Sequence, residues 1–114
     1  MIVGIETKFD AAHYLPGYKG KCANMHGHTW HVEVEVIGSV DEKSGMVYDL
    51  TELKSNVNFI IERFDHRIIN ELFPFEDKPP TCENLAMFIF DELIAYYNVQ
   101  SVKVREGEGG WART

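Results

Sequence analysis

The chain has 114 residues, of which 45% are hydrophobic and 25% charged, so it is long enough for one domain with a real core and too apolar for disorder. Its net charge of −7 argues against nucleic acid as a partner, because phosphate contacts require a basic surface. No apolar run is as long as a membrane span, and residues 1–9 alternate rather than forming a secretion signal. We therefore expect a single cytoplasmic domain over residues 1–114, with Cys22 and Cys82 as free thiols.

Apolar and polar residues alternate over residues 2–12, and this period of two predicts a first strand. Its inward side chains should be Val3, Ile5, Phe9 and Ala11. His13 continues the same parity at the end of the strand. Residues 14–25 contain a proline and two glycines, which predicts a loop.

Residues 27–38 give the clearest strand pattern in the chain. One face should carry His28, Trp30, Val32, Val34 and Val36, and the other Thr29, His31, Glu33 and Glu35. The paired histidines therefore belong to the apolar face. Residues 38–45 are typical of a turn, and we expect Met46–Tyr48 to resume as a short strand.

Two helices are predicted in the second half of the chain. Asp49 with Glu52 has the form of a capping box, which predicts a helix that ends near Phe64. Its inward side chains should be Leu50, Leu53, Val57, Ile60, Ile61 and Phe64. After a loop with three prolines at residues 74–80, Thr81 is a suitable cap for a second helix ending near Tyr97. Its inward side chains should be Leu85, Phe88, Ile89, Leu93 and Tyr96.

A third strand is expected at Ser101–Glu106, and a short fourth one after Gly107–Gly110. The order β-β-α-α-β-β indicates an α+β domain, with two helices on one face of a four-stranded antiparallel sheet. The other face should be polar. A small open sheet leaves edge strands that need partners, so we predict that the chain closes its edges against copies of itself.

Two histidines lie two positions apart, at His26 and His28, and side chains with this spacing share one face of a strand. His13, at the end of the neighbouring strand, is the best third ligand. Three neutral imidazoles with one open position are typical of catalytic zinc. Iron and copper also bind imidazole, and ordinary strand-end histidines are the simpler alternative. His31 lies on the polar face and is not expected to be a ligand.

Each of the two cysteines has two readings. Cys22 precedes His26 by four residues, so it is either a fourth ligand that closes a structural site or a base or nucleophile beside the metal. A nearby dication and two lysines would favour its thiolate. Cys82 stands in the first turn of the second helix, where the helix dipole also favours a thiolate, but a small buried residue is the simpler interpretation.

Two further sites carry carboxylates. In Asp65-His66, a carboxylate can orient an imidazole, which can in turn exchange a proton with a thiol; a helix C-terminus that favours histidine is the alternative. Glu106 ends a strand with inward parity. Its carboxylate suits the edge of a guanidine-like ring, unless it is simply a solvated strand end.

Taken together, these pieces resemble the 6-pyruvoyltetrahydropterin synthase / 6-carboxytetrahydropterin synthase family. The matching motifs are Phe9-x-Ala-Ala-His13, Cys22-x-x-x-His26-Gly-His28, Gly45-Met-Val-x-Asp49, Asp65-His66-x-x-x-Asn70, Pro80-Thr-x-Glu-Asn84 and Val104-x-Glu106. They stand in family order and span nearly the whole chain. The short gap between Cys22 and His26 resembles the bacterial and archaeal 6-carboxytetrahydropterin synthases.

The resemblance implies the tunnelling fold, in which sheets join into a barrel as trimers and two trimers stack as a hexamer with active sites between subunits. It implies the substrate 7,8-dihydroneopterin triphosphate and the products 6-carboxy-5,6,7,8-tetrahydropterin, acetaldehyde and triphosphate, within 7-deazaguanine biosynthesis. It assigns Zn²⁺ to His13, His26 and His28, catalysis to Cys22, Asp65 and His66, and pterin binding to Glu106, Thr81 and Glu83. Residues that hold the triphosphate remain unassigned.

Three alternatives remain. The same site could release a 6-pyruvoyl product. The chain could also be a non-catalytic module stabilised by zinc, with Cys22 as the fourth ligand. A cupin-like metal protein is the third, but His28 and Glu33 are five residues apart and a regular strand places them on opposite faces.

Overall fold

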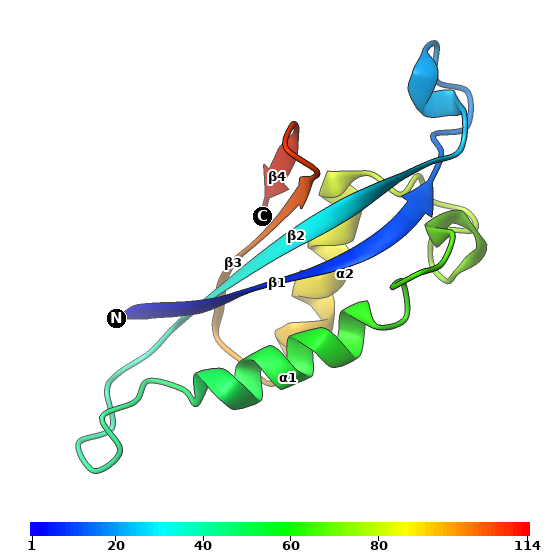
Figure 1. Cartoon of the computed structure of the whole chain (residues 1–114). Coiled ribbons are helices and arrows are strands. Elements are labelled where there is room, and N and C mark those ends of the chain that lie inside the picture. Colours follow the sequence, from blue (N-terminus) through cyan, green and yellow to red (C-terminus); the bar gives the residue numbers. More distant parts are fainter.

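The computed structural model describes all 114 residues. Its main elements are β1 (Ile2–His13), β2 (His26–Ile37), α1 (Leu50–Ile61), α2 (Cys82–Leu93), β3 (Val99–Glu106) and β4 (Trp111–Arg113). The four strands form one antiparallel sheet in the order β1-β2-β3-β4. Both helices lie against the same side of this sheet (Figure 1). The predicted α+β class and the order β-β-α-α-β-β are confirmed.

The strand register fixes which residues meet at the two ends of the sheet. β1 and β2 pair along their whole length, so that His13 lies opposite His26 at one end. In the pairing of β2 with β3, Trp30 lies opposite Glu106. The chain ends of β1 and β3 therefore meet near the start of β2, where the histidines stand.

The core lies between the sheet and the two helices. From the strands it takes Ile5, Phe9, Ala11, Trp30, Val32, Val34, Val36, Val102 and Val104. From the helices it takes Leu53, Val57, Ile60, Ile61, Leu85, Ala86, Ile89 and Leu93. The opposite face carries charged side chains, among them an ion pair of 3.4 Å between Lys103 and Glu33. Neither helix has the length and apolarity needed to cross a membrane.

Both predicted helix starts are confirmed. The Asp49 carboxylate accepts hydrogen bonds from the backbone N–H of Thr51 and Glu52 at 2.9 and 3.3 Å. The Thr81 hydroxyl accepts one from Asn84 N–H at 3.2 Å. These bonds satisfy donors that have no partner inside the helix.

Both helices end earlier than predicted. α1 stops at Ile61, and Phe64 is buried from the turn that follows. α2 stops at Leu93, whose carbonyl accepts hydrogen bonds from the N–H of both Tyr96 and Tyr97. Two predictions of inward side chains are wrong, because Leu50 is 41% exposed and Tyr96 is 79% exposed. Tyr96 lies in the closing turn, which breaks the helical period.

The short strand predicted at Met46–Tyr48 is wrong. These residues form a bend that leads into the cap of α1, and no strand of the sheet pairs with them. Tyr48 instead packs its ring against Tyr97, with ring centroids 5.4 Å apart, and its hydroxyl accepts a hydrogen bond from Asn98 N–H. An apolar triplet next to a helix cap is thus explained by packing of its aromatic residue.

The edge strand β1 is covered at one end only. The segment after α1 runs alongside it, with Ala12 N–H donating to the carbonyl of Arg67 at 3.0 Å and an isolated parallel bridge joining Ala12 to Ile68. The first part of β1 has β2 as its only strand neighbour. An edge of this kind is available to pair with another chain.

Candidate active site

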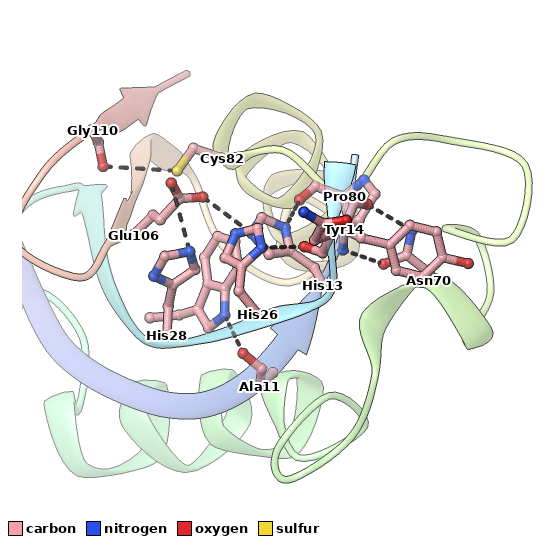
Figure 2. A network of polar contacts seen from close by, with 12 residues as sticks. Ala11, His13, Tyr14, His26, His28, Asn70, Pro80, Cys82, Glu106 and Gly110 are labelled. Carbon is pink, nitrogen blue, oxygen red and sulfur yellow. Dashed lines mark hydrogen bonds and ion pairs between the residues drawn. The ribbon is translucent and has the colours of Figure 1, made fainter. Parts of the chain in front are cut away.

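Three imidazoles converge where β1 ends and β2 begins. His13 is the last residue of β1, and His26 and His28 are the first and third residues of β2. One ring nitrogen from each lies within 4.8 Å of the other two. The ring centroids are 4.6, 5.2 and 4.8 Å apart, and the rings point toward a common centre in Figure 2.

Hydrogen bonds fix which nitrogen of two rings faces this centre. His13 Nδ1 lies 2.8 Å from the Pro80 carbonyl, and His26 Nδ1 lies 2.7 Å from the Asn24 carbonyl. Because a carbonyl only accepts, each Nδ1 carries a proton, and in the neutral ring the lone pair is therefore on Nε2. The Nε2 atoms of all three histidines are buried and have no hydrogen-bond partner.

Burial keeps two of these rings neutral near pH 7. It lowers the pKa of His13 below its ordinary value of 6.5, chiefly because the charged form loses water. Burial also lowers the pKa of His28, against an opposing influence from Glu106. Neutral imidazoles with orphaned lone pairs aimed at one point are suited to a divalent transition metal, so the donor set fits zinc.

Glu106 borders the same centre. Its carboxylate oxygens lie 3.5 Å from His13 Nε2 and 3.8 Å from His28 Nε2, which is longer than an ordinary hydrogen bond. Its side chain is 29% exposed, so Glu106 is partly accessible to a ligand. A carboxylate next to the three imidazoles can bind N–H groups of a ligand that also reaches the metal position.

Cys22 lies outside the cluster of imidazole nitrogens. It belongs to the short 3-10 helix Lys21–Ala23, is half-buried, and makes no disulfide. Its thiol is not among the ligand atoms that gather within 4.8 Å. The three imidazoles therefore gather without a cysteine, a donor set typical of catalytic rather than structural zinc sites.

Asp65 and His66 form a second, separate group. The Asp65 carboxylate accepts a hydrogen bond from Asp10 N–H at 3.0 Å, and its other oxygen lies 3.0 Å from His66 Nδ1. The bond from Asp10 N–H is the main reason that the pKa of Asp65 is lowered. His66 has a left-handed φ of 59°, and its side chain is 77% exposed. The pair thus presents an oriented imidazole on the surface, apart from the three histidines of this chain.

The N-terminus of α2 lies beside Glu106. Thr81 uses its hydroxyl as the helix cap, and Glu83 in the first turn is exposed. Cys82 lies between them, with its sulfur 3.8 Å from the Gly110 carbonyl (Figure 2). Burial, with the nearby negative charges of Glu106 and Glu83, raises the pKa of the Cys82 thiol to about 11. A thiol with this pKa stays protonated, which favours its interpretation as a small buried residue.

Some site residues escaped the sequence analysis. The backbone carbonyls of Asn24 and Pro80 orient two rings, but every residue has a carbonyl, so the sequence does not indicate this role. Asp10 was also missed, although one of its carboxylate oxygens lies within 4.8 Å of a carboxylate oxygen of Asp65 and a ring nitrogen of His66. Its even parity in the first strand places it on the exposed face, and only the fold shows that Asp65 reaches around the sheet edge to it.

Known proteins resemble this chain over most of its length. A family model described as 6-pyruvoyl tetrahydropterin synthase matches residues 2–114. A protein of Archaeoglobus fulgidus assigned as a 6-carboxy-5,6,7,8-tetrahydropterin synthase is 47% identical over 113 residues, covering 98% of this chain and 93% of that protein. A 6-carboxy-5,6,7,8-tetrahydropterin synthase of Synechocystis is 34% identical over 97 residues, covering 81% and 74%.

The solved structure of Caenorhabditis elegans 6-pyruvoyl tetrahydropterin synthase superimposes with a TM-score of 0.87 at 30% sequence identity, covering 100% of this chain and 95% of that one. The four-stranded sheet with two helices on one face is therefore the tunnelling fold. Both product names occur among the similar proteins, so these comparisons show the family and do not by themselves show the product. The chain belongs to the 6-pyruvoyl tetrahydropterin synthase family, a family of pterin synthases.

Proposed function

We propose that this protein is a zinc-dependent 6-carboxy-5,6,7,8-tetrahydropterin synthase in 7-deazaguanine biosynthesis. It converts 7,8-dihydroneopterin triphosphate to 6-carboxy-5,6,7,8-tetrahydropterin, acetaldehyde and triphosphate. The observation that carries the proposal is the set of three buried, unpaired Nε2 atoms of His13, His26 and His28 beside the Glu106 carboxylate. The 47% identity to the Archaeoglobus protein favours the carboxy product.

His13, His26 and His28 would hold the zinc, which when bound supplies Lewis-acid stabilisation of negative charge on the substrate's side-chain oxygens. Glu106 accepts hydrogen bonds from the amino and ring N–H groups of the pterin, and this fixes the ring relative to the three histidines. Thr81 and Glu83, at the start of the adjacent helix α2, contribute to the same pterin pocket.

Cys22 exchanges protons at the side-chain carbons of the substrate as a thiolate. His66 accepts and returns those protons, and Asp65 holds the His66 ring in the required tautomer. The contact of 3.0 Å between Asp65 and His66 Nδ1 supports this division of roles, since it leaves His66 Nε2 free. The lowered pKa of Asp65 keeps its carboxylate charged beside the ring.

We further propose that residues 1–114 act as one cytoplasmic domain within a trimer or hexamer, with each active site between subunits. The open edge of β1 and the exposed Asp65–His66 pair support this assembly, because both lack a partner that a neighbouring copy would supply. His66 of one copy would then act on a substrate held at the histidines and Cys22 of another.

The test is to incubate zinc-loaded protein with 7,8-dihydroneopterin triphosphate and identify the products by mass. Acetaldehyde together with a carboxylated tetrahydropterin is the expected result. A pyruvoyl product would keep the family and change the reaction. Unaltered substrate, recovered from protein that contains zinc, would exclude catalysis.

A Cys22→Ala variant separates the enzyme from a zinc-stabilised module. In the enzyme the variant keeps its zinc and loses turnover, because Cys22 lies outside the group of ligand atoms. In a module with Cys22 as fourth ligand, the same change would remove the zinc. Zinc content measured by atomic absorption distinguishes the two.

A further inference from the structure

The side-chain amide of Asn70 forms two hydrogen bonds with the backbone of one residue, Tyr14. Tyr14 N–H donates to Asn70 Oδ1 at 3.0 Å, and Asn70 Nδ2 donates to the Tyr14 carbonyl at 2.8 Å (Figure 2). The pairing of β1 with β2 ends at His13, so Tyr14 has no strand partner there. The amide therefore takes the place of a neighbouring strand for one residue.

Asn70 is itself firmly held. It lies in the short 3-10 helix Ile69–Glu71, and the side chain of Ile69 is fully buried. The residues just before it already pair with the end of β1, through the bond from Ala12 N–H to the Arg67 carbonyl. Asn70 thus extends the hydrogen bonding between the end of β1 and the segment that begins with Asp65 and His66.

Tyr14, which Asn70 holds, lies in the chain between two parts of the candidate site. His13, whose Nε2 faces the centre, immediately precedes Tyr14. Leu15 follows it, and Leu15 N–H donates to the Cys22 carbonyl at 2.7 Å, which closes the loop that carries the thiol. Any shift of the Tyr14 backbone would therefore move the His13 ring and the base of the Cys22 loop together.

We propose that Asn70 is a positioning residue that sets His13 and the Cys22 loop in register with the segment carrying Asp65 and His66. This inference rests on the proposed zinc site. Asn70 acts through the Tyr14 backbone, so its removal changes the placement of a ligand without removing a ligand. Loss of a partner that hydrogen-bonds a ligand directly lowers metal affinity about 10- to 100-fold in known metal sites. Asn70 acts one residue further from the ligand, so we expect an effect near the lower end of this range.

Two variants and one matched control test the proposal. Asn70→Ala removes both hydrogen bonds. Asn70→Asp keeps the volume and the acceptor for Tyr14 N–H, but places an oxygen against the Tyr14 carbonyl; it carries the test if Asn70→Ala does not fold. Asn58→Ala is the control, because Asn58 Oδ1 accepts a hydrogen bond of 2.6 Å from the Thr7 hydroxyl and so ties α1 to the same strand, away from the histidines.

Zinc affinity is measured by competition with a chromophoric chelator, and ligand geometry by the visible spectrum of the Co²⁺-loaded protein. Both Asn70 variants should bind zinc about tenfold or more weakly and show an altered Co²⁺ spectrum, while the control stays within about twofold of the unmodified protein. In the metal-free protein, the Tyr14 amide should exchange its hydrogen faster in Asn70→Ala, which loses the acceptor for Tyr14 N–H, than in the unmodified protein or the control.

Unchanged zinc affinity and an unchanged Co²⁺ spectrum in both Asn70 variants would overturn the positioning role. An equal loss in the Asn58→Ala control would also overturn it, since general destabilisation would then explain the effect. Absence of zinc binding by the unmodified protein would instead overturn the proposed metal centre. The failures of the two proposals are therefore distinguishable.

Discussion

The carboxylate of Glu106 lies 3.5 Å from Nε2 of His13, although the two residues stand at opposite ends of the sequence. The register that places Glu106 opposite Trp30 brings it to this position. We predict that Glu106→Gln leaves zinc bound and lowers kcat/KM about 100-fold or more, because a neutral amide loses a charge-assisted contact to the pterin. Steady-state kinetics and zinc content check this. Loss of zinc with the change would mean that Glu106 supports the metal instead.

Removal of one imidazole should abolish tight metal binding. We predict that His28→Ala lowers zinc affinity more than about 100-fold, beyond the range expected for an outer partner. His31→Ala is the matched control, since His31 lies on the same strand and points to the opposite face. Chelator competition measures both. Equal zinc affinity in the two variants would contradict the assignment of His28.

The two cysteines should differ in reactivity. Cys82 is buried, with its thiol pKa raised to about 11, so its thiolate fraction is negligible near pH 8. Cys22 is only half-buried. We expect iodoacetamide to alkylate Cys22 and spare Cys82 in the folded, zinc-free protein, as read by peptide mass spectrometry. Alkylation of Cys82 at a similar rate would show that the core around it opens readily.

The metal-free protein should lose stability on mild acidification. Burial lowers the pKa of His13 and His28 below 6.5, so the unfolded chain binds protons at a higher pH than the folded chain does. Their contribution to the free energy of unfolding is therefore present above pH 6.5 and is lost as the pH falls through 6.5 toward the folded pKa values.

The urea concentration at the unfolding midpoint, measured in the presence of EDTA, should accordingly decrease when the pH is lowered from about 7.5 to about 5.5. His28→Gln, which removes one of the two groups, should show a smaller fall than the unmodified protein. A midpoint that is constant or rises over this range would contradict the burial of neutral imidazoles.

Active sites between subunits predict complementation. Cys22→Ala and His66→Ala should each be inactive alone, because each lacks one member of the proton relay. If subunits of the two variants mix randomly, about one quarter of the sites receive an intact Cys22 from one chain and an intact His66 from another. Mixing after mild dissociation should restore activity to about that level. No recovery, with mixing shown by native mass spectrometry, would place the relay within a single chain.

The sequence by itself determined the alternation of the strands, both helix caps and the order of the elements. Local rules suffice for these features, because a side chain's face in a strand and a cap's hydrogen bonds depend on near neighbours. The same rules failed at Tyr96 and at residues 46–48. In both places the residues lie in turns or bends, and such a segment has no fixed period for a pattern to follow.

Tertiary structure alone decided how distant residues meet. The spacing of His26 and His28 predicted a shared face, but only the strand register placed His13 opposite His26 and Glu106 beside them. The roles of the Pro80 carbonyl and the Asn70 amide were also decided by the fold, since hydrogen bonds to backbone atoms depend on position in space rather than on residue type.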